Sequence, residues 1–220
     1  MRLPGSISPD KKIVYLHIPK TAGTSINHHF RSILGHHNVG WLGIDFSVED
    51  LKDAKKIEKY KVLGGHFGLR QAQDIPFPVT CLSTVREPVS RALSYYRYVL
   101  NMPSEKTRMG LCGDFAADLA GPFGSLISNQ QCAFLGLQNA ADPINALAQI
   151  HNLYVAPVEC TQALLDGISA ALNVETRPLG RENEGIGLLP QPDSVTFENL
   201  QSLVKKDREL YDGIVRESYK

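Results

Sequence analysis

The sequence lacks an excess of either charge, since 23 lysine and arginine residues balance 23 aspartate and glutamate residues. A chain without net charge does not attract nucleic acid or an anionic membrane as a whole, so any anion must be bound by local groups. No apolar stretch approaches the roughly eighteen residues of a membrane span, and the N-terminal "MRLPGSISPDKK" lacks the apolar core of a signal peptide. We therefore expect a soluble, cytoplasmic protein with no membrane span and no nucleic-acid partner.

Cysteine is scarce and forms no pattern. Cys81, Cys112, Cys132 and Cys160 are far apart and contain no C-x-x-C pair, which argues against a zinc knuckle and requires no disulfide framework. The histidine pairs at 28–29 and 36–37 are adjacent in sequence, and neighbours on a helix diverge by about 100°, so they do not chelate together easily. We expect structural thiols and no metal site.

The alternation of apolar patterns indicates the fold class. A chain of 220 residues with 43% hydrophobic content can bury one full core, and we expect a single domain over residues 1–220. Short apolar runs at 12–18, 60–68, 79–88 and 151–159 predict strands, and amphipathic segments at 24–34, 88–100 and 160–172 predict helices. Strands that alternate with helices predict an α/β domain: a central parallel sheet with helices on both faces.

The remaining segments give weaker patterns. Residues 194–218 carry apolar side chains at helical spacing and predict one long amphipathic helix. Residues 101–124 and 175–192 are rich in glycine and proline, so we expect loops over one end of the sheet. Long loops of this kind often form lids or substrate walls.

The stretch "HIPKTAGTS" at 17–25 joins the first predicted strand to the first predicted helix. A helix N-terminus presents unpaired N–H groups, Gly23 permits close approach of the backbone, and Lys20 adds a positive charge. Thr21, Thr24 and Ser25 offer hydroxyl groups. The order differs from a Walker A loop, in which the lysine follows the glycines. On the residues alone, a phosphate loop and an ordinary turn with a surface lysine are equally good interpretations.

The stretch "VREPVSRALSYY" at 85–96 repeats this arrangement. Arg86 ends a predicted strand, Pro88 opens a helix, and Ser94 lies two turns further along it. Arginine binds phosphate through two parallel hydrogen bonds, and a hydroxyl completes a compact anion site. The alternative is a salt bridge at the helix N-terminus between Arg86 and Glu87 or another carboxylate, with Ser94 solvated. Two anion sites at strand ends predict a ligand with separated phosphates.

Together, these two stretches resemble the sulfotransferase family that includes the heparan sulfate 2-O- and 6-O-sulfotransferases and their bacterial relatives. The resemblance implies a P-loop-like domain that uses 3′-phosphoadenosine 5′-phosphosulfate (PAPS) as donor, releases adenosine 3′,5′-bisphosphate and needs no metal. It implies that Lys20, Thr21, Ala22, Gly23, Thr24 and Ser25 bind the 5′-phosphosulfate, and that Arg86 and Ser94 bind the 3′-phosphate. Arg181, in "RENEG", is a further candidate for the nucleotide site, with a solvated loop as the alternative.

The segment "LGGHFG" at 63–68 resembles the family's histidine segment and places His66 as the catalytic base. Lys20 then neutralises charge on the leaving oxygen. A structural histidine is the alternative for His66, and His17 ranks second as a base. The segments "SNQQCAFLG" and "DRELYD" also resemble the family. The heparan 2-O enzymes have a second histidine where this chain has Gly64, and the animal Golgi enzymes carry an N-terminal membrane anchor that this sequence does not show. Both differences favour a soluble, bacterial relative.

The residues themselves predict a site for two phosphates, and the resemblance implies transfer of a sulfuryl group from PAPS to a hydroxyl of a carbohydrate, glycoconjugate or related acceptor. Two other functions stay open. A nucleotide-dependent kinase with an atypical phosphate loop would need Mg²⁺ ligands, and no aspartate ends an apolar strand to supply them. A non-catalytic nucleotide-binding protein would have kept the fold without turnover.

Overall fold

A computed structural model describes residues 11–180 and 188–218 of the chain. A parallel sheet forms its centre, with the strand order β2-β3-β1-β4-β5. The strands are β1 Lys12–Leu16, β2 Val39–Trp41, β3 Val62–Gly65, β4 Val79–Val85 and β5 Leu153–Pro157. Because every pairing is parallel, the carboxyl ends of all these strands lie along the same edge of the sheet.

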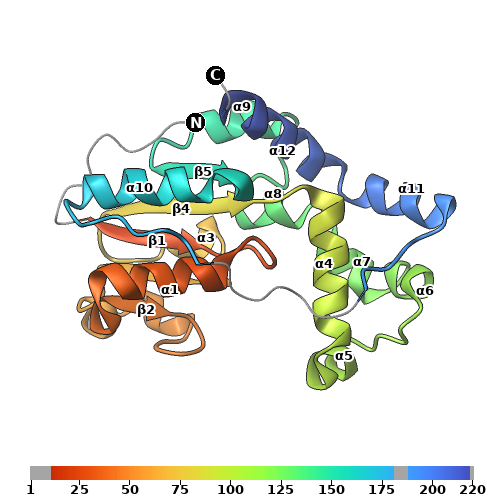
Figure 1. Cartoon of the computed structure of the whole chain (residues 1–220), viewed down its shortest axis with the longest axis horizontal. Helices are drawn as coiled ribbons and strands as arrows, with labels where there is room; N and C mark the ends of the chain where they lie inside the picture. The colour runs from red at the N-terminus through yellow and green to blue at the C-terminus, as the bar shows by residue number, and fades with distance from the viewer. Residues whose placement is uncertain (1–10, 181–187, 219–220) are drawn as a thin grey trace.

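Helices cover both faces of the sheet (Figure 1). Alternate residues of β1 show this, because successive side chains of a strand point to opposite faces. Ile13 and Tyr15 pack with α1 (Gly23–Leu34) and α10 (Thr161–Ala171), whereas Val14 and Leu16 share a core with the other face. The helices of that other face are α2 Ala54–Ile57, α3 Leu69–Ala72, α8 Gln130–Phe134, α9 Pro143–Ala148 and α12 Lys205–Ser218. The expected α/β class, with a parallel sheet between two helical layers, is confirmed.

A third cluster of helices lies beyond the carboxyl edge of the sheet, around α4 (Pro88–Leu100) (Figure 1). It contains α5 Pro103–Arg108, α6 Phe115–Leu119, α7 Pro122–Ile127 and α11 Ser194–Leu203. Their apolar side chains enclose Tyr96 and Phe123, whose ring centroids are 5.1 Å apart. The prediction of loops over residues 101–124 was therefore wrong, because three short helices pack there on α4.

The long C-terminal helix predicted for residues 194–218 was also wrong. The chain leaves the helical conformation at Val204 (φ −107°, ψ 20°), which separates α11 from α12. Asn129 stabilises this break, since its backbone N–H donates to the carbonyl of Leu203 and its Oδ1 accepts from the N–H groups of Lys206 and Asp207. The hydrogen bonds that a continuous helix would make are thus replaced by bonds to a residue distant in sequence.

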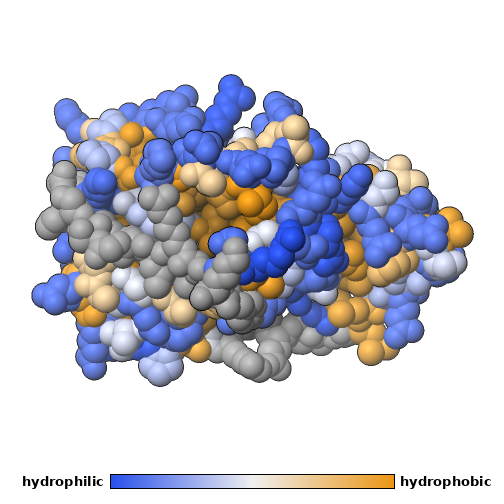
Figure 2. Space-filling model, turned by 90° about the horizontal axis from the view of Figure 1, so that it is seen from above, coloured by the Kyte–Doolittle hydropathy of each residue, from blue (hydrophilic) through white to orange (hydrophobic). Residues whose placement is uncertain are grey.

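The face seen from above, over α9, α10 and α12, shows apolar side chains at the surface (Figure 2). Part of this surface is a groove of about 390 Å³ between β5, α9 and α12, with Ile144, Leu147 and Val155 among its lining residues. None of the helices in the described ranges is long and apolar enough to cross a membrane. Both the groove and the apolar surface lie apart from the carboxyl edge of β1, where the polar motifs are.

Candidate functional site

The strand register brings His17 and His66 together at the carboxyl edge. Leu16 of β1 pairs with Gly65 of β3, so the residues that follow them emerge side by side. Gly65 has φ +145°, a conformation that an L-residue rarely adopts, and the chain turns there into His66. The two imidazole rings stack with their centroids 4.1 Å apart and their planes at 24°.

One hydrogen bond fixes the tautomer of His66. Its Nδ1 lies 2.8 Å from the backbone carbonyl oxygen of His17. A carbonyl can only accept, so Nδ1 carries the proton and Nε2 keeps its lone pair. The surrounding protein atoms lower the pKa of His66, and this hydrogen bond raises it in part. His66 is exposed, so the chain presents a neutral imidazole with an accepting nitrogen.

His17 is in a different environment. It is 9% exposed, and burial lowers its pKa well below the ordinary value, with the charges of His66 and Lys20 adding to the effect. Its ring packs on Gly23, at the start of α1: a Cβ atom at Gly23 would lie 2.0 Å from His17 Nε2. His17 is thus a neutral packing group between the two motifs.

Gly23→Ala is accordingly expected to lower the free energy of unfolding by about 1–3 kcal/mol, because the His17 ring must move to admit the methyl group. Thermal unfolding followed by circular dichroism measures this. Gly180→Ala is the matched control, since nothing lies within 4 Å of a Cβ built there. An equal, small effect of the two substitutions would contradict the close contact.

The loop between β1 and α1 is held in an unusual backbone conformation. Lys20 has φ +70° and Ala22 has φ +66°, both in the left-handed region. Two hydroxyl groups of β4 hold this part of the chain. Ser83 Oγ donates to the carbonyl of Leu16, the last residue of β1, at 2.8 Å, and Thr84 Oγ1 donates to the carbonyl of Thr21 in the loop at 2.6 Å. Left-handed residues at non-glycine positions are costly and cluster at functional sites.

The side chains of the predicted phosphate loop divide into two groups. Thr21 is fully buried, and its hydroxyl donates to the carbonyl of Ile18 at 2.8 Å, so this hydroxyl shapes the loop. Ala22 and Thr24 are exposed, and Gly23 and Ser25 are buried in the first turn of α1. Within the described residues no side chain caps this helix, and its first turn begins next to the loop.

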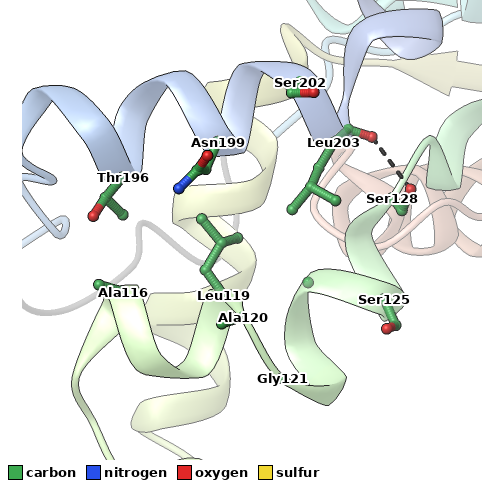
Figure 3. Close-up of a pocket in the computed structure, with 11 residues that line it drawn as sticks. Ala116, Leu119, Ala120, Gly121, Ser125, Ser128, Thr196, Asn199, Ser202 and Leu203 are labelled. Carbon is green, nitrogen blue, oxygen red and sulfur yellow. Dashed lines mark hydrogen bonds between the residues drawn. The ribbon is translucent and has the colours of Figure 1, made fainter.

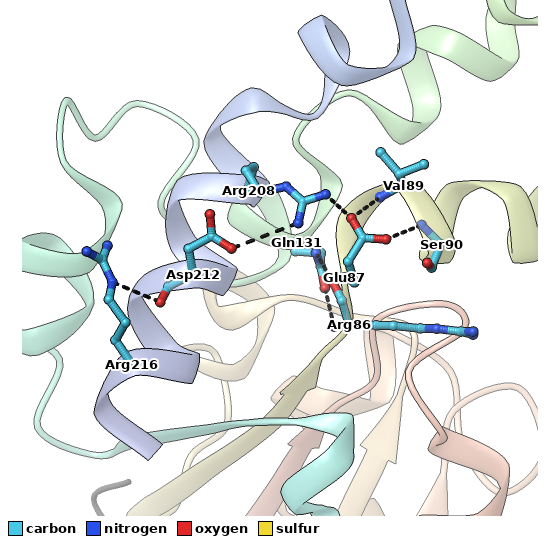
Figure 4. A network of polar contacts seen from close by, with 8 residues as sticks. All are labelled: Arg86, Glu87, Val89, Ser90, Gln131, Arg208, Asp212 and Arg216. Carbon is cyan, nitrogen blue, oxygen red and sulfur yellow. Dashed lines mark hydrogen bonds and ion pairs between the residues drawn. The ribbon is translucent and has the colours of Figure 1, made fainter. Parts of the chain in front are cut away.

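Arg86 follows β4 and lies near the loop. Its side chain extends across the β1–α1 loop and away from Glu87 (Figure 4). The Glu87 carboxylate accepts from the N–H groups of Val89 and Ser90 at 3.1 and 2.6 Å, which caps α4, and it also pairs with Arg208. The alternative of an Arg86–Glu87 salt bridge is therefore wrong, while Pro88 opens α4 as predicted.

Lys20 completes a cluster of cations with Arg86 and Arg97. Burial lowers the pKa of Lys20, and the charges of Arg86 and Arg97 lower it further. Lys20 Nζ lies 4.6 Å from the centroid of the Tyr98 ring, a cation–π contact. Within the part of the chain that the structure describes, neither Lys20 nor Arg86 forms an ion pair with a carboxylate. Neighbouring cations without a carboxylate partner are suited to bind a polyanion.

Ser94 lies on α4 and is 4% exposed. Arg97 and Tyr98 follow it within the next helical turn, where they approach Lys20. Sequence reasoning missed Tyr98 and the grouping of Arg97 with Lys20, because only the packing of α4 beside the loop brings them together. Arg181 lies outside the described residues.

A model of the sulfotransferase family matches residues 6–110. The chain is similar to this family over these residues, which make up just under half of its length. The matched range contains the β1–α1 loop, His66, Arg86 and Ser94. No curated protein matches the chain. Among solved structures, the crystal structure of mouse sulfotransferase SULT7A1 complexed with PAP is similar at 14% identity and a TM-score of 0.46, over 90% of this chain and 66% of that one. The chain thus spans just under two thirds of that protein.

One departure from the family's histidine segment has a structural reason. A Cβ atom at Gly64 would lie 2.2 Å from the ring of Trp41 on β2. The space that a second histidine would need at this position is therefore filled by an indole ring.

A groove of about 500 Å³ between α11, α6 and α7 lies apart from these residues (Figure 3). Small and hydroxyl-bearing side chains line it, with Ser125, Ser128, Thr196 and Ser202 among them, and no charged residue of the described ranges lines it. It does not supply the charge that a phosphate ligand requires. The cation cluster at the end of β1 and β4 is the better candidate site.

Proposed function

We propose that the protein is a sulfotransferase that moves the sulfuryl group of PAPS to a hydroxyl of a carbohydrate or related acceptor. One observation carries the proposal: Lys20 and Arg86, which form no ion pair with a carboxylate of the described residues, lie at the same sheet edge as His66, whose Nε2 accepts a proton. All three lie within the residues that match the family.

The residues present fit a nucleotide with two separated anionic groups. The first N–H groups of α1, with Lys20, Gly23, Thr24 and Ser25, would hold the 5′-phosphosulfate, because a helix N-terminus favours negative charge. Thr21 and Ala22 contribute through the backbone of the loop. Arg86 and Ser94 would hold the 3′-phosphate. The mouse sulfotransferase structure contains PAP, and we propose the corresponding donor for this chain.

PAPS supplies the sulfuryl group. His66 Nε2 takes the proton from the acceptor hydroxyl, which makes that oxygen a better nucleophile. Lys20 provides positive charge for the oxygen from which the sulfuryl group departs. The lowered pKa of Lys20 reflects its place among other cations, and an anionic ligand relieves that repulsion.

The family resemblance supports a saccharide acceptor, and the exposure of His66 is compatible with one. Because His66 is at the surface, a hydroxyl of a large glycoconjugate can reach it as readily as that of a small sugar. We infer a saccharide or glycoconjugate acceptor.

Calorimetric titration with adenosine 3′,5′-bisphosphate, without metal, tests the nucleotide site. We expect micromolar binding and weaker binding of ADP or ATP with Mg²⁺. Transfer of radiolabelled sulfate from PAPS to a panel of sugars then tests the activity. Preference for ATP with Mg²⁺ would indicate the kinase instead, and bisphosphate binding without transfer to any acceptor would indicate a non-catalytic binding protein.

The kinase alternative needs carboxylates near the phosphates to hold Mg²⁺. The carboxylate next to Arg86 in sequence, Glu87, is used by α4 and Arg208. Because this carboxylate is already bound to the helix N-terminus and to an arginine, it is not free to hold Mg²⁺, and this favours the sulfotransferase.

A further inference from the structure

Arg86 lies where the sheet no longer holds the backbone. The pairing of β4 with β1 ends at Ser83, and its pairing with β5 ends at Val85. A residue at this point has a free N–H and a free carbonyl unless another group binds them. Both groups of Arg86 are bound by a single side chain, that of Gln131 (Figure 4).

The Gln131 amide pairs with Arg86 in the manner of a neighbouring strand. The N–H of Arg86 donates to Gln131 Oε1 at 2.8 Å, and Gln131 Nε2 donates to the carbonyl of Arg86 at 2.9 Å. Gln131 is fully buried. A buried amide with two good hydrogen bonds has little freedom, so it fixes the direction in which the Arg86 side chain leaves the backbone.

Gln131 is itself held by the C-terminal helix. Its backbone N–H donates to Asp207 Oδ2 at 3.0 Å, and the N–H of Cys132 donates to Asp207 Oδ1 at 2.8 Å. Asp207 is fully buried on α12. The next residue, Arg208, pairs with Glu87 and so reaches the other half of the same β4–α4 turn.

We propose that Gln131 is a positioning residue for Arg86, held by Asp207, and that α12 thereby sets the affinity of the site for the 3′-phosphate. The inference rests on the proposed function, because it assigns the 3′-phosphate to Arg86. Gln131 touches neither the nucleotide nor the acceptor in this account. It acts by keeping the guanidinium directed across the β1–α1 loop.

The test compares adenosine 3′,5′-bisphosphate with adenosine 5′-monophosphate, which lacks the 3′-phosphate. The dissociation constant of the monophosphate divided by that of the bisphosphate isolates the contribution of the 3′-phosphate site. Gln131→Met keeps the length of the side chain and removes both hydrogen bonds to Arg86. We expect the ratio to fall roughly tenfold or more, because small misplacements of a binding group are costly, while the affinity for the monophosphate changes little.

Gln130→Met is the matched control. Gln130 is the preceding residue of α8, is 7% exposed, and its Oε1 accepts from Arg91 Nη1 at 2.6 Å, so it has no bond to Arg86. The Gln130→Met substitution should lower thermal stability and leave the ratio of dissociation constants unchanged. If Gln131→Met lowers both affinities equally, as a purely structural residue would, the inference is overturned.

A second variant and a double substitution complete the test. Gln131→Glu keeps an acceptor for the Arg86 N–H but loses the donor to the Arg86 carbonyl, so this variant should also lower the ratio. It replaces Gln131→Met if that variant does not fold. In an Arg86→Ala background, substitution of Gln131 should leave the ratio unchanged. A wild-type ratio near one would contradict the proposed function. A high wild-type ratio retained in the Gln131 variants would contradict only this inference.

Discussion

His66→Ala is expected to lower kcat by about two to four orders of magnitude, the usual contribution of a general base. Binding of adenosine 3′,5′-bisphosphate should stay within about twofold of the wild type, because His66 takes the proton of the acceptor and holds no phosphate in this account. The measurements are steady-state sulfate transfer and calorimetric titration of the same preparation.

His151→Ala is the control for this substitution. His151 is exposed and precedes β5, at the amino-terminal edge of the sheet, opposite the site. It should leave kcat and nucleotide binding unchanged. Full turnover in His66→Ala would remove the histidine from the mechanism, and loss of the folded state would show that His66 is structural.

The pH profile gives a second signature of His66. The lowered pKa, below the ordinary 6.5, means that the base is neutral throughout the neutral range. The rate of sulfate transfer should therefore stay level as the pH falls through 6.5. It should decrease about tenfold per pH unit only below the lowered pKa of His66. Any transfer that remains in His66→Ala should lack this acid limb. An identical acid limb in the variant would assign it to another group.

Arg86→Ala is expected to weaken adenosine 3′,5′-bisphosphate binding by roughly 2 to 4 kcal/mol, the typical loss when one partner of a buried charge pair is removed. That is about 30- to 1,000-fold in the dissociation constant. Binding of adenosine 5′-monophosphate should change little. The fold should persist, since the backbone bonds between Arg86 and Gln131 do not involve the deleted side chain.

Two arginine variants sharpen this result. Arg86→Lys keeps the charge but loses the paired N–H groups, so its affinity should lie between those of the wild type and Arg86→Ala. Arg216→Ala is the control, because Arg216 lies toward the end of α12, where its Nε donates to the carbonyl of Asp212 (Figure 4). If removal of the Arg86 side chain weakened both nucleotides equally, the 3′-phosphate would have to be bound elsewhere.

The parts of the fold that depend on local pattern were predictable from the sequence. Four of the strands, and the helices after β1, β4 and β5, have clear apolar patterns, and α1 ends at Leu34, as the predicted range did. The positions of Lys20, His66 and Arg86 at strand ends followed from the same pattern, because parallel strands share a carboxyl edge. β2 was missed because it has only three residues, Val39–Trp41.

The short helices between 101 and 127 had signals that the abundance of glycine and proline obscured. Pro103 and Pro122 open α5 and α7, and the carboxylate of Asp114 accepts from the first N–H groups of α6. Proline is favoured at the first position of a helix and aspartate at its N-cap. In this segment these residues begin helices rather than interrupt them.

Contacts between distant segments could not be predicted from the sequence. The stack of His17 on His66 requires the register of β1 and β3. The bond between Gln131 and Arg86 spans 45 residues, and that between Asn129 and Lys206 spans 77. No local pattern of one sequence shows which buried amide binds which strand end, or that Asn129 divides the last helix in two.

The pairing of α12 with the β4–α4 turn has a consequence for the order in which the site forms. Arg208 and Glu87 are separated by 121 residues, and closing so long a loop comes late in folding. During synthesis the β1–α1 loop and Arg86 emerge long before Asp207 and Arg208. A nascent chain that has completed its first four strands therefore still lacks α12, whose Asp207 holds Gln131 and whose Arg208 pairs with Glu87. If Gln131 and α12 position Arg86 as we propose, such an unfinished chain is expected to bind the 3′-phosphate more weakly than the complete fold does.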